Sequence, residues 1–280
     1  MTKTHAFSAS DAPTYQKVDL RVENVNLQIS MISKTGSLAP IVFLHGFGSS
    51  KEEFNDLAYL PAFRDYGMLA YDAPGCGETK CDNLGKVSMS FLVKTADTLL
   101  QHLKIEKFHL MGHSMGGLTA LMLASEFPDR VLSFVNIKGN LSPEDCFLSR
   151  QVFEFPSDDP LAFFDAFIER ARRALSYSNA VYASNLPHKV RPEVVYGILS
   201  TMVELSDNTD LMAKFLGLPC PRMFMYGEHN AGLSYLPALR QTTVELAEIP
   251  HSGHFPMYSN PPEMFHRIAR FLSRVGAENL

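Results

Sequence analysis

The chain has 280 residues, of which 46 % are hydrophobic and 20 % are charged, so it is long enough for one globular domain with an inserted subdomain. The formal net charge is −5, and no basic stripe or polybasic patch indicates nucleic acid or an anionic membrane as a partner. No apolar run reaches the roughly 18 residues needed to span a bilayer.

The N-terminus carries no apolar segment typical of a secretory signal, so we expect a cytoplasmic protein. The four cysteines follow no metal-binding spacing, and we expect no metal site. Cys76 and Cys81 are close enough in sequence to pair, but reduced thiols are the expectation for this compartment.

Apolar patterns predict the order of strands and helices. Residues 1–14 are polar and aperiodic, as in a loose terminus. Residues 18–32 alternate, with a break at Glu23-Asn24, and predict two antiparallel edge strands. Later strands are predicted at 40–44, 67–72, 108–112, 131–137, 221–227 and 244–249, and helices at 87–103, 118–124, 161–175, 192–205, 233–240 and 262–275. The fold class is therefore α/β, with a doubly wound, mostly parallel sheet of eight strands.

The main motif of the chain is Gly-His-Ser-Met-Gly at residues 112–116, between an apolar strand and a helix-forming run. Gly-x-Ser-x-Gly in this setting predicts a nucleophile elbow, which holds Ser114 at a strained turn with its hydroxyl projecting from the sheet. The two glycines allow the strand and the helix to approach closely. The helix N-terminus favours negative charge at the same place.

With this motif the chain resembles the α/β-hydrolase superfamily, from about residue 18 to residue 275. The resemblance implies a core domain made of residues 1–138 and 219–280, with a helical cap subdomain at 139–218 inserted after the sixth strand. Residues 139–218 contain no further buried-strand run and are rich in aromatic residues, which suggests an apolar roof over the site. The resemblance implies a small-molecule substrate and no cofactor.

His-Gly-Phe-Gly at residues 45–48 resembles the oxyanion loop of the family. Negative charge that develops on a carbonyl oxygen needs fixed N–H donors, and the resemblance assigns this role to the backbone N–H groups of Phe47 and Met115. Four further residues are expected to line the substrate-binding site: His45, Gly46, His113 and Lys138. Asp72 lies in a turn that resembles a scaffold feature of the family.

His254 follows Gly253 after the last predicted strand, where the family carries its catalytic base. It is expected to take the Ser114 proton and to pass it to the leaving group. His251 is the less favoured alternative.

The residue that orients His254 is not fixed by the sequence. The two family positions for the acid hold Asn230, three residues after Gly227, and Lys138, at the end of the sixth strand. Glu228 is the favoured orienting group, and the amide oxygen of Asn230 is the next alternative.

Two less favoured arrangements stay open. In the first, Glu144 or Asp145 reaches His254 from the mouth of the cap. In the second, no group orients His254. Lys138 either reaches solvent or points at the site, where its charge would oppose the imidazolium and weaken hydrolysis.

These residues predict a serine hydrolase that cleaves a small to medium apolar carboxylic ester or lactone through an acyl-enzyme on Ser114. The missing acid motivates a second interpretation, a catalytically weak or inactive ligand-binding protein on the same scaffold. A third is a relative that cleaves C–C or C–X bonds. Serine at the elbow argues against haloalkane dehalogenase chemistry, which uses aspartate there in this superfamily.

Overall fold

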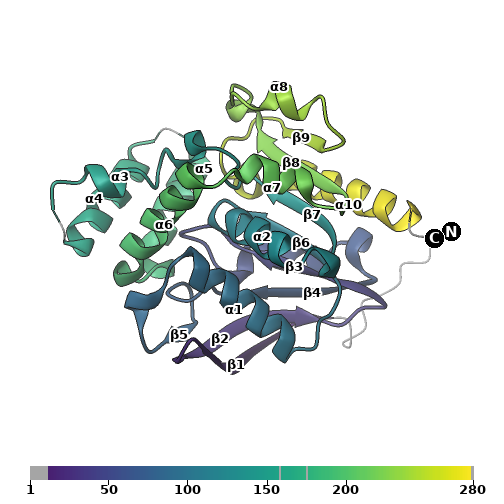
Figure 1. The fold of residues 1–280 in the computed structure, drawn as a ribbon, viewed down its shortest axis with the longest axis horizontal. Coiled ribbons are helices and arrows are strands. Elements are labelled where there is room, and N and C mark those ends of the chain that lie inside the picture. The colour runs from purple at the N-terminus through teal and green to yellow at the C-terminus, as the bar shows by residue number, and fades with distance from the viewer. Residues whose placement is uncertain (1–11, 158, 175, 279–280) are drawn as a thin grey trace.

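The computed structural model describes residues 12–157, 159–174 and 176–278, and shows a twisted sheet with helices on both faces (Figure 1). The expectation for the N-terminus lies mostly outside these residues. The strands are β1 (Thr14–Val22), β2 (Val25–Lys34), β3 (Leu38–Leu44), β4 (Tyr66–Tyr71), β5 (Lys80–Cys81), β6 (Phe108–His113), β7 (Val131–Ile137), β8 (Arg222–Gly227) and β9 (Glu245–Ile249).

The strand order is β1-β2-β4-β3-β6-β7-β8-β9, and β5 pairs with β2 outside this path. All strands from β4 to β9 along the path are parallel, whereas β1 and β2 are antiparallel additions at one edge. The doubly wound, mostly parallel sheet is thus confirmed. The sequence missed β5, because two residues carry no periodic pattern.

The hairpin between β1 and β2 turns at Glu23 and Asn24, as the break in the alternation predicts. Both residues have positive φ, 47° and 66°, and Val22 pairs with Val25 across the turn. Positive φ at both central residues matches the right-handed twist of the flanking strands. The turn thereby fixes the register of the edge hairpin.

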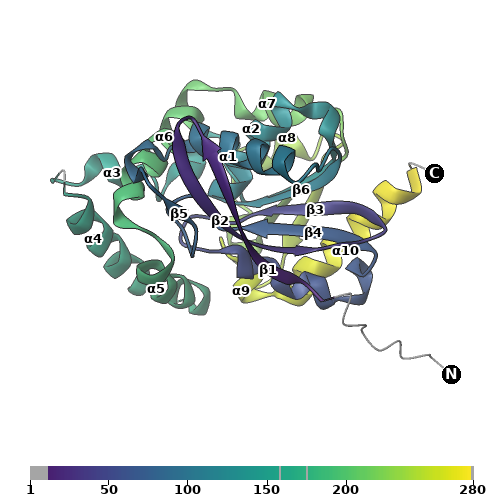
Figure 2. The same cartoon turned by 90° about the horizontal axis from the view of Figure 1, so that it is seen from below.

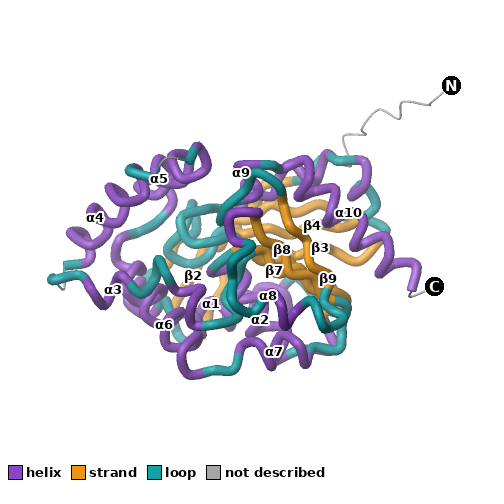
Figure 3. The backbone as a smooth tube through the Cα atoms, turned by 90° about the horizontal axis from the view of Figure 1, so that it is seen from above, coloured by secondary structure: helices purple, strands orange, loops and turns teal. Residues whose placement is uncertain are grey.

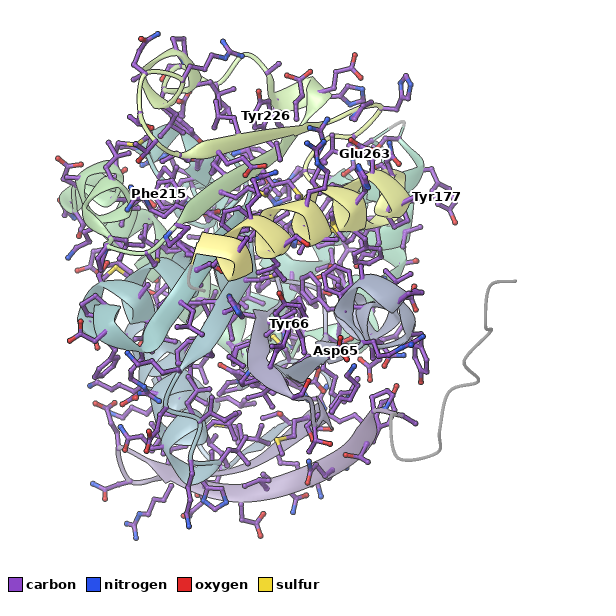
Figure 4. All side chains as sticks on the ribbon, turned by 90° about the vertical axis from the view of Figure 1, so that its right-hand side faces the viewer. Asp65, Tyr66, Tyr177, Phe215, Tyr226 and Glu263 are labelled. Carbon is purple, nitrogen blue, oxygen red and sulfur yellow. The ribbon has the colours of Figure 1, made fainter. Side chains whose placement is uncertain are left out.

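The helices form two layers around the sheet. They are α1 (Met89–His102), α2 (Met115–Glu126), α3 (Gln151–Glu154), α4 (Pro160–Arg172), α5 (Tyr177–Lys189), α6 (Val195–Asn208), α7 (Leu211–Gly217), α8 (Leu236–Leu239), α9 (Pro256–Ser259) and α10 (Pro261–Glu278). The helices α1, α2 and α7 cover one face, and α9 and α10 cover the other (Figures 2 and 3). Figure 4 shows Phe215 on the α7 side and Glu263 on the α10 side.

The helices α3 to α6 lie between β7 and β8 in sequence, and they sit beyond the carboxyl ends of the parallel strands (Figures 1 and 2). The sequence predicted α4 and α6 but missed α5. Pro187 inside α5 gives the pattern of a break, although the helix continues through it to Lys189. We call α3 to α6 the inserted helices.

The inserted helices are fastened to the core along the end of α5. The N–H of Gly77 donates to the carbonyl of Lys189 at 2.9 Å, and the N–H of Arg191 donates to the carbonyl of Gly75 at 2.9 Å. Tyr182 and Leu186 of α5 pack directly on Gly48, where an added Cβ would lie 2.5 Å from the Tyr182 ring. This edge of the insertion is therefore in direct contact with the loop after β3.

A buried ion pair holds the turn after β4. Asp72 accepts from the Lys51 ammonium at 2.9 Å and from the Lys51 backbone N–H at 2.8 Å, and both side chains are inaccessible to solvent. The N–H of Glu78 donates to the same carboxylate at 2.9 Å. The contacts of Asp72 are those of a scaffold residue, because they tie this turn to the loop after β3.

The contact between α2 and β3 leaves no room for a side chain at Gly116. A Cβ there would lie 2.1 Å from the carbonyl oxygen of Leu44. We expect Gly116→Ala to lower the free energy of unfolding by more than about 2 kcal/mol, because backbone has to move. Gly232→Ala is the matched control, since a Cβ at Gly232 meets nothing within 4 Å. Equal denaturant midpoints for the two variants would contradict this packing.

Candidate active site

Ser114 lies between β6 and α2 with φ 52° and ψ −117°. A non-glycine residue with positive φ is strained and persists only where its surroundings hold it. Here the N–H of Ser114 donates to the carbonyl of Ile137 at 3.0 Å, and its carbonyl accepts from Leu118 at 3.0 Å. The turn therefore presents the hydroxyl at the carboxyl end of the sheet, as the elbow motif predicts.

His254 lies in the loop between β9 and α9 and reaches the serine. Its Nε2 is 3.0 Å from the Oγ of Ser114, a hydrogen-bond distance. The carbonyl of His254 accepts from the Nε2–H of His113 at 2.9 Å. The rings of Phe255 and Phe147 meet the imidazole edge-on, with centroids at 4.9 and 5.8 Å. Backbone and aromatic contacts thus orient the imidazole.

The surroundings of His254 disfavour its charged form. Burial lowers the pKa of His254 well below its usual range, and His113 and the positive charge of Lys138 lower it further. Its Nδ1 is buried and has no hydrogen-bond partner among the described residues. The imidazole is therefore a neutral base at pH 7, without a carboxylate to stabilise the imidazolium.

Glu228 is not bonded to His254. Its carboxylate accepts from the backbone N–H of His251 at 2.8 Å and lies 3.8 Å from the His251 ring. Glu228 begins a short 3-10 turn after β8 that directs its side chain outward, where it is half exposed. The prediction of Glu228 as the orienting group therefore does not agree with the structure.

Asn230 occupies the position three residues after the end of β8 and lines the same cleft as His254. Its Oδ1 is buried and has no hydrogen-bond partner in the described part of the chain. Asn230 and His254 thus line one cleft, and each has a buried polar atom without a partner among the described residues. Asn230 therefore stays a prediction as the orienting group.

Lys138 does not reach solvent, because its side chain is 1 % exposed and forms an ion pair with Asp145. The other Asp145 oxygen accepts from the N–H groups of Leu141 and Ser142, and the Tyr235 hydroxyl donates to both oxygens at 3.0 and 3.2 Å. Asp145 is therefore fully bonded and does not orient His254. We call Lys138, Asp145 and Tyr235 the lysine cluster.

Glu144 does not orient His254 either. Its carboxylate accepts from the hydroxyl of Ser234 at 2.6 Å and from the Ser234 N–H at 3.1 Å, so it links the segment after β7 to the loop after β8. The sequence did not indicate Tyr235 as part of the site. No motif marks a tyrosine that becomes a partner only through the fold.

The proposed oxyanion donors lie on both sides of Ser114. Met115 is the first residue of α2, where an N–H group has no carbonyl four residues back within the helix. Phe47 lines the small cavity that also contains Ser114 and His254. The structure therefore brings the two predicted loops together at the serine.

His45 and His113 lie behind the site and do not line the substrate cleft. His45 is buried, with its Nε2 accepting from the N–H of Ala73 at 2.9 Å and its Nδ1 at 2.8 Å from the Gly46 carbonyl. His113 lies under Gly46, where an added Cβ would be 2.6 Å from its Nδ1. The prediction that these side chains, with Lys138, line the substrate site is corrected to a supporting position.

Two connected features give access to the serine. A cavity of about 30 Å³ contains Ser114 and is lined mainly by aromatic and aliphatic side chains, with Asn140, Asp145 and Ser149 as further polar members. A larger cleft of about 620 Å³ extends from His254 along α4 and α5. Phe147, Phe167, Tyr182 and Phe255 line both. The space nearest to the hydroxyl is thus small and mainly apolar, and the outer space is larger.

Residues 39–194 match the sequence profile described as the alpha/beta hydrolase fold. The chain belongs to the α/β-hydrolase fold family. In the family the elbow, the oxyanion loop and a histidine after the last strand lie at the carboxyl edge of the sheet, where this structure brings Ser114, Phe47 and His254 together.

Two relatives that are 25 % and 27 % identical to this chain, and a solved structure that is 22 % identical, agree with this assignment. The chain is 27 % identical over 252 residues to the 2-succinyl-6-hydroxy-2,4-cyclohexadiene-1-carboxylate synthase of Enterobacter sp. strain 638, covering 83 % of this chain and 91 % of that protein. It is 25 % identical over 264 residues to the pimeloyl-[acyl-carrier protein] methyl ester esterase of Aeromonas salmonicida, covering 86 % and 97 %. A thermophilic esterase from Thermogutta terrifontis superposes with a TM-score of 0.74 at 22 % identity, covering 93 % and 99 %.

Further expectations from the sequence concern metals, thiols and membranes. Within the described residues no group of three or more His, Cys, Asp or Glu side chains is arranged to hold a metal ion. The four cysteines are free thiols. No described helix combines the length and apolar character that a membrane crossing requires.

Breaking the lysine cluster tests how far the site depends on it. We expect Lys138→Met to lower the free energy of unfolding by about 3–5 kcal/mol, because it leaves the buried Asp145 carboxylate without its cation. The double variant Lys138→Met/Asp145→Asn removes both charges and should regain most of the loss. The measurement is urea unfolding at pH 7, and additive effects of the two substitutions would contradict direct coupling.

Proposed function

We propose that the protein is a serine hydrolase that cleaves a small to medium, apolar carboxylic ester or lactone. The observation that carries the proposal is the 3.0 Å contact between Ser114 Oγ and His254 Nε2 at a strained strand-to-helix turn. The esterase names among the relatives support the same reaction class. In this proposal residues 139–218 form a cap that closes the apolar cleft over the serine.

The reaction would run through an acyl-enzyme. Ser114 Oγ attacks the ester carbonyl while His254 Nε2 takes its proton, and the carbonyl oxygen becomes an anion held by the N–H groups of Phe47 and Met115. Collapse of this intermediate breaks the bond to the alcohol oxygen, which leaves with the proton from His254. A water molecule then gives a proton to His254 and attacks the acyl carbonyl, which releases the acid and restores Ser114.

The electrostatics around His254 would make this hydrolysis slow. The step that forms imidazolium places a positive charge on a buried ring whose Nδ1 is unpaired and whose pKa is lowered by burial, His113 and Lys138. Exchange of the orienting aspartate for asparagine costs about 10⁴ in rate in one well-studied serine protease. The same observation favours a second candidate, a ligand-binding protein that turns its ligand over weakly or not at all.

A third reaction class is consistent with the scaffold. The relative from Enterobacter is named as a synthase and not as a hydrolase. Cleavage of a C–C or C–X bond with the same Ser114–His254 pair is therefore the alternative if esters are not turned over. Analysis of the products separates it from ester hydrolysis.

Hydrolysis of p-nitrophenyl acetate, butyrate and octanoate tests the proposal. We expect the wild-type protein to turn over, with acetate or butyrate preferred because the cavity at Ser114 measures about 30 Å³. Ser114→Ala should lose at least about 10³ of the rate, since it removes the nucleophile. Ser125→Ala, on the outer part of α2, is the control and should keep full activity. Equal rates for wild type and Ser114→Ala would disprove the assignment.

Restoring a carboxylate beside His254 tests the cause of a slow rate. We expect Asn230→Asp to raise kcat by about tenfold or more, because a carboxylate would accept from His254 Nδ1–H and stabilise the imidazolium. Asn260→Asp is the control, since Asn260 donates to the carbonyl of Pro250 and does not line the cleft. The readout is kcat at pH 7.5 with p-nitrophenyl acetate. An unchanged or lower kcat in Asn230→Asp would contradict this cause.

A further inference from the structure

Beneath the proposed oxyanion loop lies a carboxyl group that the proposed mechanism does not use. Glu53 lies on a 3-10 segment, η2 (Lys51–Tyr59), and its side chain is 1 % exposed. Its Oε2 is 3.8 Å from the Nδ1 of His113, whose side chain is also 1 % exposed. His113 directly precedes Ser114, so this pair lies one residue from the proposed nucleophile.

Neither Glu53 oxygen has a hydrogen-bond partner among the described residues, and neither does the Nδ1 of His113. The hydroxyls of Ser49 and Tyr258 and the backbone N–H of Gly46 lie close enough to favour the carboxylate, although none has the geometry of a full hydrogen bond. Lys189 is the cation that acts on it, and it is itself bonded to the hydroxyl of Ser50. A buried carboxylate with so little compensation is costly, whereas a neutral carboxylic acid is not.

The protonation of the pair follows from its burial. Burial raises the pKa of Glu53 to about 7, against smaller opposing contributions from Ser49, Tyr258, Gly46 and Lys189. Burial, with smaller contributions from His45 and Lys138, lowers the pKa of His113 to about 4, against the opposing effect of its hydrogen bond to the His254 carbonyl. Below about pH 7, a mostly protonated Glu53 thus faces a neutral imidazole.

The tautomer of that imidazole is fixed from its other side. The Nε2 of His113 donates to the carbonyl of His254 at 2.9 Å, so the proton of the neutral ring is on Nε2. The Nδ1 then carries a lone pair directed at Glu53. A carboxylic acid at this place can donate to the lone pair once the 3.8 Å separation shortens to hydrogen-bond distance, whereas a carboxylate and this lone pair repel each other.

We propose that Glu53 is a positioning residue that works as a buried carboxylic acid, donating to His113 Nδ1, and that loss of this one proton weakens the site. The inference rests on the proposed function. In the acid form, the chain Glu53–His113–His254 carbonyl holds the loop after β9 against the loop after β3. Gly46 takes part directly, because an added Cβ there would touch the His113 ring.

Loss of the Glu53 proton would change the electrostatic field at the proposed oxyanion site. An ionised Glu53 places a buried negative charge under the loop whose Phe47 N–H is proposed to hold the developing anion. Buried charges of like sign act over several ångströms because the interior screens them weakly. The rate of attack by Ser114 should therefore fall as the pH rises above about 7.

The free energy of unfolding also depends on pH through Glu53. The sign of this dependence identifies the group that titrates. The pKa of Glu53 is higher in the folded protein than in the unfolded chain, so the folded state binds more protons between about pH 4.5 and 7. The free energy of unfolding therefore falls as the pH rises through this range. Glu53→Gln keeps a donor at the same place and abolishes the titration.

The first experiment compares melting temperatures of wild type, Glu53→Gln and Glu52→Gln from pH 5 to 8.5. The melting temperature of Glu53→Gln minus that of the wild type should increase by several degrees between pH 5 and about pH 7.5. Glu52→Gln should show a constant difference, because ion pairing lowers the pKa of Glu52 to about 2, below the range of the scan. A constant difference for Glu53→Gln would overturn the proposal.

Nitrogen-15 histidine spectra of the wild-type protein test the pair without a variant that has to fold. The Nδ1 shift of His113 should change with a midpoint near pH 7, while the Nε2 proton is retained. If both His113 nitrogens stay unchanged from pH 5 to 8.5, Glu53 does not donate to the ring and the proposal is wrong.

The rate at which a fluorophosphonate labels Ser114 connects the pair to the site. From pH 7 to 8.5 this rate should fall about tenfold in the wild type relative to Glu53→Gln, in line with a like-charge interaction in the interior. Parallel profiles for both proteins would contradict a role in positioning. If neither protein is labelled, the proposed hydrolase function fails, while the melting and histidine measurements still decide the state of Glu53.

Discussion

The site depends on one steric constraint, the direct packing of α2 on the ends of β3 and β6. Gly112 and Gly116 provide it, because an added Cβ at either position would lie within 2.3 Å of backbone atoms. This approach holds Ser114 at a positive φ and presents its hydroxyl to His254. It also brings the N-terminus of α2 beside the loop after β3. The position of the Ser114 hydroxyl therefore depends first on the backbone packing that the two glycines allow.

The electrostatics of the site differ from those expected of an efficient serine hydrolase. The strand end that carries an acid in some relatives holds Lys138, and the nearby Asp145 is bound to that lysine. The other acid position holds Asn230, with its Oδ1 unpaired among the described residues. His254 thus sits near a compensated cation and an amide, and in the proposed mechanism the charge that forms on it would have no counter-charge. The proposed hydrolase would therefore work with a weakened acid–base system.

The sequence predicted the scaffold well because local patterns encode it. Strand periodicity located the parallel strands to within one or two residues, and Gly-x-Ser-x-Gly identified Ser114. The contacts around His254 were harder to predict from the sequence, because they join segments that are far apart along the chain. Glu228 and Asn230 are two residues apart, and only the short turn after β8 decides which of them faces inward.

Burial of polar residues was equally hard to predict. Lys51, Glu53 and Lys138 look like surface residues in one dimension, yet the side chain of each is 1 % exposed. Asp72 and His113, the partners of Lys51 and Glu53, come from the ends of other strands, and Asp145 is seven residues from Lys138 in the segment after β7. No periodic pattern marks such pairs, because each residue is buried by its neighbours in space and not by its position in a helix or strand.

The attachment of the inserted helices indicates where small molecules enter and leave the cleft. The end of α5 is tied to the turn after β4, and Tyr182 and Leu186 rest on Gly48, so this edge cannot lift without disturbing the loop after β3. The outer cleft is lined by Phe147 and Gln151, by α4 and by the first half of α5, on the side away from the tied end of α5. Molecules should therefore enter and leave along that side, so that diffusion in and out proceeds while the loop after β3 keeps its shape.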